Sequence, residues 1–250
     1  MSTEAKQVHG LVHATEQGTP QGSILSPLLS NIYLHYVLDL WFTHRVRKAS
    51  RGEAYYFRYA ADFLACFQYK GEAVRFHQQL EDRLEGFGLQ LAAEKTQCLE
   101  FGRYARENAH KRGEKPNEFT FLGFTHYCGK TREGYFKVKR RTSRKKLDQS
   151  LRRFTEWAHK ARGVLRKGEM LRLARARVVG HLSYYAITDN ADRCSYFVHR
   201  AEHILFKWLN RKSQRRSYTW DTFVLALARI GWPRPHIRID LNPCRRAEAR

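Results

Sequence analysis

Basic side chains interleaved with aromatic ones are the residues of this sequence best suited to chemistry, and that chemistry is phosphate binding. Lys and Arg cluster in four stretches of the second half, at 137–146, 152–153, 172–177 and 211–216. Cationic side chains neutralise phosphates and release condensed counterions, so they bind nucleic acids in a salt-dependent way. The aromatic residues between the clusters have helical spacing, which predicts that most of them pack in a core rather than stack on bases.

The positive charge is concentrated in one half of the chain. The 250 residues carry a net charge of +22; residues 1–120 hold 15 Lys/Arg and 14 Asp/Glu, whereas residues 121–250 hold 31 and 10. A surplus of this size exceeds that of an ordinary solvated face and indicates a polyanionic partner, most often nucleic acid. The cations expected to contact it are Arg144, Lys145, Lys146, Arg152, Arg153, Arg211, Lys212, Arg215 and Arg216.

Composition and patterning exclude several other classes. The five cysteines are far apart and form no CxxC pair, which argues against a zinc ribbon or a disulfide framework and for a reducing compartment. The N-terminus lacks the apolar region of a secretory signal, and the longest charge-free run, residues 17–38, is too polar to span a bilayer. We therefore expect a cytoplasmic protein without membrane contact.

One histidine pattern suggests a different chemistry. His199 and His203 are the first and last residues of an HxxEH sequence. In zinc peptidases, two histidines in this pattern lie one helical turn apart and hold a metal ion between them. No acidic third ligand is evident downstream, and the surrounding sequence is basic. We therefore expect no zinc site there.

The first part of the chain is predicted to mix helices and strands. Ser26 as N-cap and Pro27 at the first helical position predict a helix start, and the apolar stripe that follows continues to a basic stretch at 45–51. Aromatic-rich runs on both sides of a short break at 60–62 predict a β-hairpin. An amphipathic helix is expected at 71–87, with Val74 on its buried face. Short strands are expected at 89–91, 97–101, 119–125 and 135–139.

The second part is predicted to be entirely helical. Its four expected helices cover residues 143–161, 168–187, 191–210 and 219–230. This order of elements predicts an α+β fold, in which an antiparallel sheet with packed helices (residues 1–140) precedes an all-α basic domain (residues 141–250).

Six sequence motifs occur in a fixed order along residues 15–240. Four lie in the first part: GTPQGSILSPLLSNIY at 18–33, FRYAADF at 57–63, LQLAAEKT at 89–96 and FLGF at 121–124. Two lie in the basic part: GHLSYY at 180–185 and WLNRKSQRR at 208–216. Together they resemble the reverse transcriptase/maturase proteins encoded by group II introns.

The resemblance implies an architecture and a set of site residues. Residues 1–140 would form a partial polymerase palm, and residues 141–250 the α-helical thumb, also called the maturase (X) domain. Nucleotide and template would contact Gly18, Pro20, Gln21, Gly22 and Lys95, and the primer end would be gripped by Phe121, Leu122, Gly123 and Phe124. The implied partners are intron RNA and a template–primer duplex, and the cofactor of an intact relative is Mg²⁺.

The sequence departs from the family pattern at the catalytic hairpin. The family has two adjacent aspartates there, whereas this chain has Ala61 followed by Asp62. The family's fingers, and a palm strand that bears a further aspartate, lie upstream of the first motif and are not in this sequence. Two Mg²⁺ need several carboxylates, and nothing in the sequence places the nearest acids, Asp39 and Glu53, at the turn. We therefore expect an incomplete metal site at Asp62, no stable Mg²⁺ binding and negligible polymerase activity from this chain alone.

Other functions stay open at this point. The chain could be one subunit of a split reverse transcriptase, completed by a fingers-containing polypeptide. It could also be a repurposed basic RNA-binding protein without a role in splicing, or the product of a truncated gene. The capacity that a palm-and-thumb chain retains is RNA binding, for which we expect a ribonucleoprotein-associated, cytoplasmic location.

Overall fold

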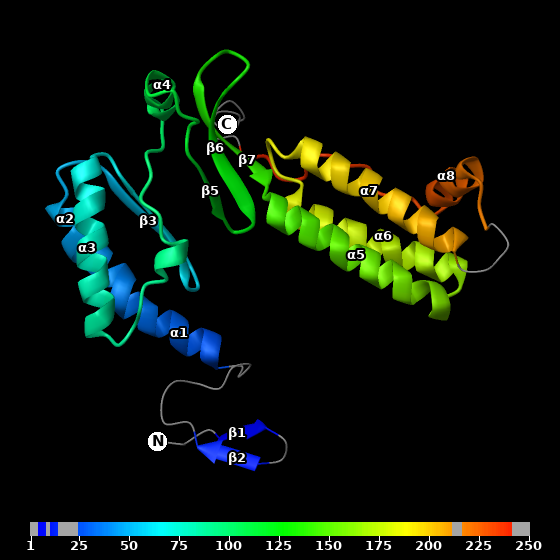
Figure 1. Ribbon diagram of the computed structural model, residues 1–250, viewed down its shortest axis with the longest axis horizontal. Coiled ribbons are helices and arrows are strands. Elements are labelled where there is room, and N and C mark those ends of the chain that lie inside the picture. The colour runs from blue at the N-terminus through cyan, green and yellow to red at the C-terminus, as the bar shows by residue number, and fades with distance from the viewer. Residues whose placement is uncertain (1–4, 9–10, 15–24, 212–216, 242–250) are drawn as a thin grey trace, which may run out of the picture. The chain divides into compact units, whose positions relative to one another are not determined.

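The structure, a computed structural model, describes residues 5–8, 11–14, 25–211 and 217–241 (Figure 1). It divides into two compact units, residues 1–100 and 101–250. The sequence pattern predicts a boundary at residue 140. The compact units divide earlier because the sheet that follows residue 117 clusters with the helices after it. The assignment of the two parts as palm and thumb stays a prediction.

The first unit begins with a small hairpin and a long helix. Two short strands pair antiparallel: β1 (Ala5–Val8) and β2 (Leu11–Ala14). The parts of the long helix, two of them π-helical, are α1 (Ser26–Leu34), His35–Asp39, Phe42–Val46 and α2 (Arg47–Ala49). It starts one residue earlier than predicted, with Leu25 rather than Ser26 as N-cap, because the Leu25 carbonyl already accepts a hydrogen bond from the Leu29 amide (2.9 Å).

A larger hairpin and a further helix complete the first unit. Strands β3 (Ala54–Tyr59) and β4 (Asp62–Phe67) pair antiparallel with Tyr59 opposite Asp62, which confirms the predicted hairpin. The long helix and α3 (Lys70–Gly86) cover one face of it. The core between them includes Val37, Leu38, Phe42, Phe76, Leu80 and Leu84. Val74, predicted to be buried, is exposed, because the stripe at 76, 80 and 84 faces the hairpin.

Residues 89–101 differ from the prediction. The pattern predicts strands at 89–91 and 97–101, but these residues are irregular around a 3₁₀ turn at Ala93–Lys95. Leu89 and Leu91 still pack against the core of the first unit. Their apolar character therefore reflects burial without strand pairing.

The second unit starts with a short helix and a three-stranded antiparallel sheet. Helix α4 (Ala105–Lys111) lies where no element is predicted. The strands of the sheet, in the order β5-β6-β7, are β5 (Glu118–Phe121), β6 (Phe124–Lys130) and β7 (Phe136–Thr142). The prediction of a single strand at 119–125 is wrong. A tight turn at Leu122–Gly123 divides it, because both residues have positive φ (50° and 81°) and reverse the chain.

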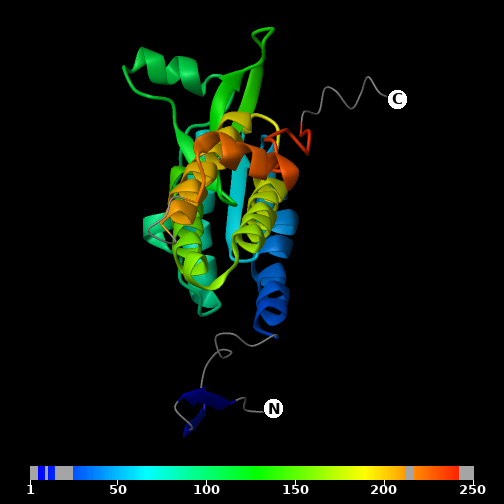
Figure 2. The ribbon, with the colours of Figure 1, turned by 90° about the vertical axis from the view of Figure 1, so that its right-hand side faces the viewer.

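Four helices follow, close to the predicted ranges. They are α5 (Arg144–Val164), α6 (Lys167–Tyr185), α7 (Ala191–Asn210) and α8 (Trp220–Arg229). Helices α5, α6 and α7 pack side by side, as Figures 1 and 2 show. Their apolar faces and that of α8 form one core, which includes Leu147, Phe154, Met170, Val178, Phe197, Leu205 and Phe223.

The described chain is thus a mixture of helices and small antiparallel sheets, as an α+β fold requires. None of the described helices combines the length and the apolar character that crossing a bilayer needs. The architecture therefore positions two tight hairpin turns, one in each unit, and a helical surface behind the second.

Candidate functional site

Asp62 lies at the tip of the β3–β4 hairpin, after a two-residue turn of Ala60 and Ala61. Ala60 has a φ of 52°, which a residue with a Cβ atom rarely adopts. Ala61 and Asp62 are both exposed. The Asp62 carboxylate has no hydrogen bond or ion pair with another described residue. The hairpin therefore presents one free carboxylate to solvent.

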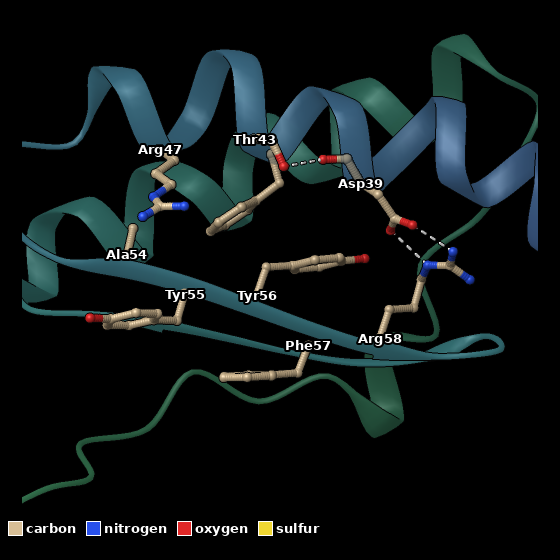
Figure 3. A pocket seen from close by; sticks show the side chains of 9 residues that line it. Asp39, Thr43, Arg47, Ala54, Tyr55, Tyr56, Phe57 and Arg58 are labelled. Carbon is tan, nitrogen blue, oxygen red and sulfur yellow. Dashed lines mark hydrogen bonds and ion pairs between the residues drawn. The ribbon is translucent and has the colours of Figure 1, made fainter.

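The side chain of Arg58 ties this turn to the long helix. Its guanidinium donates two hydrogen bonds to Asp39 (Nε–Oδ1 2.7 Å, Nη2–Oδ2 2.6 Å; Figure 3). Its Nη1 donates to Asn31 Oδ1 (2.9 Å) and to the Ala60 carbonyl (3.0 Å). The hydrogen bonds from Arg58 hold the pKa of Asp39 below its ordinary value. A charge-assisted, bidentate pair of this kind fixes geometry as well as adding stability, so the turn has a defined position.

A second two-residue turn, Leu122–Gly123, is held by the end of α6. The Tyr184 hydroxyl donates a hydrogen bond to the Leu122 carbonyl (2.9 Å), and the Phe124 ring stacks on that of Tyr184 with centroids 5.7 Å apart. Tyr185 lies over Gly123, where an added Cβ would come within 3.1 Å of the tyrosine hydroxyl. The structure thus brings together the FLGF and YY motifs, which lie about sixty residues apart in sequence.

Behind this second turn, one buried amide connects three elements. The Asn190 side chain, with no exposed surface, accepts a hydrogen bond from the Thr142 amide (2.7 Å). It donates to the Thr142 hydroxyl (2.7 Å) and to the Tyr185 carbonyl (2.8 Å). Thr142 ends β7, Tyr185 ends α6 and Asn190 precedes α7. Because a buried polar network of this kind rigidifies its surroundings, the tyrosine pair keeps a fixed position relative to the sheet.

The outward face of α5 is basic. Leu147, Phe154 and Ala158 point into the core. The exposed residues of the helix include the cations Lys145, Lys146, Arg152 and Arg153, together with the acids Asp148 and Glu156. Arg144 at the start of the helix is also exposed, and the nearest carboxylate oxygen of Asp148 is 3.9 Å from its Nε. The cations predicted on this helix are therefore all open to solvent.

The structure places the other predicted residues apart from this surface or does not describe them. Arg211 follows α7, where its guanidinium lies 5.8 Å from the centre of the Trp208 ring. Lys95 is exposed in the first unit. The predicted residues outside the described part of the chain are Gly18, Pro20, Gln21, Gly22, Lys212, Arg215 and Arg216.

The HxxEH pattern places two histidines side by side on α7. The Nε2 atoms of His199 and His203 are 3.1 Å apart, and the His203 ring stacks on Trp220. In the described residues, no group of three His, Cys, Asp or Glu side chains is arranged to hold a metal ion. The pair therefore lacks the third protein ligand of a zinc peptidase in that part of the chain.

The order of these features along the chain has a counterpart among known proteins. Residues 4–126 match the family model of reverse transcriptases (RNA-dependent DNA polymerases). The matched stretch includes the β3–β4 hairpin with Asp62 and the Leu122–Gly123 turn. No curated protein matches the sequence.

The reverse transcriptase match implies a Mg²⁺ site at the hairpin, and the described residues do not fit it. Mg²⁺ takes near-octahedral oxygen ligands, and a two-metal site needs several carboxylates. Of the acids nearest in sequence, Asp39 is engaged by Arg58, and Glu53 precedes the far end of β3, where its amide bonds to Gln68. The turn is left with Asp62 as its one free carboxylate.

Sequence reasoning missed the contacts that hold the two turns. Arg58 had a signal: it occupies an inward-facing position in an aromatic strand, where a charged side chain requires a buried partner. Tyr184 lies in the GHLSYY motif, but nothing local links it to Leu122. The role of Asn190 has no sequence signal either, because its partners come from elements brought together only by folding.

Proposed function

We propose that this chain carries the palm and thumb of a group II intron-type reverse transcriptase/maturase, which binds RNA and has an incomplete polymerase site. The observation that carries the proposal is an intact, clamped hairpin with a single free carboxylate, Asp62, next to Ala61. The reverse transcriptase match supports the polymerase class. Mg²⁺ belongs to an intact relative, and this chain alone does not hold it stably.

RNA is the partner that the second unit suits best. A-form duplexes are recognised through their shape and backbone rather than through base edges in the deep groove. A helix with Lys145, Lys146, Arg152 and Arg153 on its outward face supports this mode. We assign the contact with the primer end to the Leu122–Gly123 turn. The Cγ atom of Lys146 lies 3.7 Å from the position that a Gly123 Cβ would take, so the aliphatic part of this lysine borders the turn.

Primer extension tests the incomplete site. The purified chain is given a poly(rA) template with an oligo(dT) primer, dTTP and either Mg²⁺ or Mn²⁺. We expect no template-dependent cDNA, because loss of metal clamping removes several kcal/mol of transition-state stabilisation and each 1.36 kcal/mol is tenfold in rate. Clear cDNA synthesis that Asp62→Asn abolishes would contradict the proposal.

Charge reversal tests the RNA surface. We expect Lys145, Arg152 and Arg153 changed together to Glu to lower affinity for intron RNA by about 100-fold or more, and to flatten its salt dependence. The same reversal of Arg211, Lys212, Arg215 and Arg216 should also weaken binding. The matched control reverses Arg45, Lys48 and Arg75 in the first unit, with little expected change. Equal affinity for intron RNA and an unrelated RNA would favour a repurposed RNA-binding protein over a maturase.

A second candidate, a subunit of a split reverse transcriptase, is favoured by one surface of α1. Leu28, Leu29 and Ile32 lie on one side of this helix and are each about half exposed (57, 48 and 49%). Exposed apolar surface of this kind is typical of an interaction site. Co-expression with a fingers-containing polypeptide tests this candidate. Stable co-purification, lost on changing Leu28 and Ile32 to Ser, and activity of the pair after Ala61→Asp would support it.

A further inference from the structure

A pocket lies along strand β3, on the side away from β4. It has a volume of about 350 Å³ and is lined by the consecutive residues Ala54–Arg58 of the strand and by side chains of the long helix. Figure 3 shows Arg47 reaching from that helix toward Ala54 at one end, and the Asp39–Arg58 pair at the other. The pocket therefore lies between the long helix and strand β3.

The backbone of β3 that borders this pocket lacks a neighbouring strand. Among the described residues, β3 pairs with β4 alone. The Gln68 amide donates to the Glu53 carbonyl (3.0 Å), so the odd-numbered residues of β3 direct their N–H and C=O groups toward β4. Antiparallel ladders alternate, so Ala54, Tyr56 and Arg58 direct theirs outward, along the pocket. An edge with free donors and acceptors is a template for another strand.

The charges around the pocket select the kind of strand. Arg47 is exposed and has no hydrogen bond or ion pair with another described residue. Asp39, the one acid that lines the pocket, is already neutralised by Arg58. A second copy of this chain paired through the same edge would add another Arg47 without an acid to meet it. A nucleic-acid strand offers phosphate acceptors, which match the N–H groups and leave the carbonyls of the edge unmatched.

We propose that the free edge of β3 binds an extended segment of a partner polypeptide as an added strand, with an acidic side chain of that segment on Arg47. Main-chain hydrogen bonds to the edge supply affinity and the side-chain pocket supplies specificity, as in other cases of strand addition. This proposal does not depend on RNA binding or on polymerase activity.

Fluorescence anisotropy with two N-methylated peptides tests the strand addition. The probe is a fluorescein-labelled Thr-Val-Glu-Val-Thr-Val peptide, titrated with the full chain at low salt. Two further versions carry N-methyl groups on alternate residues, one on the odd and one on the even positions. We expect one version to lose binding more than tenfold and the other to bind as the parent does, because only one set of amides faces β3. Equal binding of both, or no binding of the parent peptide, would overturn the proposal.

Substitution of Arg47 tests the charge. Arg47→Gln should weaken binding of the Glu peptide about three- to fivefold and leave binding of the matching Gln peptide unchanged, in line with an exposed ion pair. Arg45→Gln, on the same helix but outside the pocket, is the control. An equal effect of both variants would overturn the proposal, as would displacement of the peptide by a U12 oligonucleotide in the parent chain but not in Arg47→Gln. A dimer by light scattering that the peptide fails to dissociate would also overturn it.

Discussion

Ala60 and Leu122 are each the first residue of a two-residue hairpin turn, and their φ angles are 52° and 50°. The carbonyl of each accepts a hydrogen bond from a side chain outside the turn, Arg58 in one case and Tyr184 in the other. The surroundings differ. The first turn is held by an ion pair and precedes the exposed Asp62, whereas the second is held by aromatic packing at the end of a helix.

This difference shows that the position of the first turn is independent of which side chain residue 61 carries. None of the hydrogen bonds that position the first turn involves the side chain of residue 61. An alanine there leaves the Asp39–Arg58 pair and the strand register in place. The second turn depends on packing against a whole helical unit. Its geometry therefore persists as long as that unit is folded, with or without an active polymerase site.

The largest effect is expected from removal of the ion pair. Arg58→Ala leaves Asp39 without its counter-charge, in a pair whose side chains are only 11 and 26% exposed. We expect a loss of about 3 kcal/mol in the stability of the first unit and no change in the second. Urea dependence of amide exchange in β3–β4 and in α5–α7 measures the two separately. Arg75→Ala on α3 is the control. The same loss of stability in both variants would show that the Asp39–Arg58 pair has no special role in holding the first turn.

Acid should loosen the second turn before the first. Burial lowers the pKa of His181 to about 4, and its ring packs on Tyr185. Because this folded-state pKa lies below the ordinary 6.5, the unfolded chain binds more protons. Stability is therefore intact above about pH 6.5 and falls as the pH drops toward 4, by about 3 kcal/mol. The pKa of Asp39 is lowered from 3.8, so the Asp39–Arg58 ion pair that holds the first turn weakens only below about pH 4.

Exchange of the Ser143 amide reports on this acid effect, because that amide donates to the Gly123 carbonyl (2.9 Å). Its protection should decrease between pH 6.5 and 4 in the parent chain. His181→Phe keeps the stacking on Phe197 and should remove most of that decrease. A decrease of unchanged size in the variant would assign the effect to another group.

A smaller effect is expected from the tyrosine hydroxyl. Tyr184→Phe removes the hydrogen bond to the Leu122 carbonyl and keeps the ring on Phe124, so we expect a loss of about 1 kcal/mol. Thermal unfolding of the second unit measures it. Tyr196→Phe, at an exposed tyrosine on α7, should change nothing. If both variants unfold like the parent chain, packing alone holds the second turn.

The smallest effect is a gain of stability at the first turn. Ala60→Gly relieves the left-handed φ of 52°, and we expect the first unit to gain about 0.5–1 kcal/mol. Ala61→Gly is the matched control, since Ala61 has no positive φ and glycine there adds only flexibility to the unfolded chain. Denaturant midpoints of the two variants should therefore shift in opposite directions.

Local sequence signals predicted the first hairpin and all the helices except α4 well. The α7 prediction, 191–210, agrees with the structure at both ends. The strand expected at 119–125 failed because the Leu122–Gly123 turn depends on Tyr184 and Tyr185, which no short window of sequence contains. The strands expected at 89–91 and 97–101 failed because apolar spacing signals burial and does not distinguish a paired strand from an irregular segment.

The candidate site was predictable where it rests on residue identity and not where it rests on contacts. The motif places Asp62 and Ala61 at a hairpin, and the structure has them there; their role in a metal site stays a prediction. The engagement of Asp39 by Arg58 decides whether a second carboxylate is available at the turn, and it required the packing of the long helix on the hairpin. Helical spacing predicted that the cations of α5 are exposed, because their apolar neighbours define the buried face.

The Asn190 amide determines where this chain can be cut for recombinant work. A product that starts at residue 141 would keep Thr142 and helices α5–α8 but lose most of β7. The pairing of Thr142 with Phe124 positions the Thr142 amide that donates a hydrogen bond to Asn190, so this hydrogen bond would lose its support. A product that starts at residue 101 would keep the sheet, the amide and the helices as one piece. Crystallisation or binding studies of the basic half should therefore use the longer product, and limited proteolysis should spare the junction between β7 and α5.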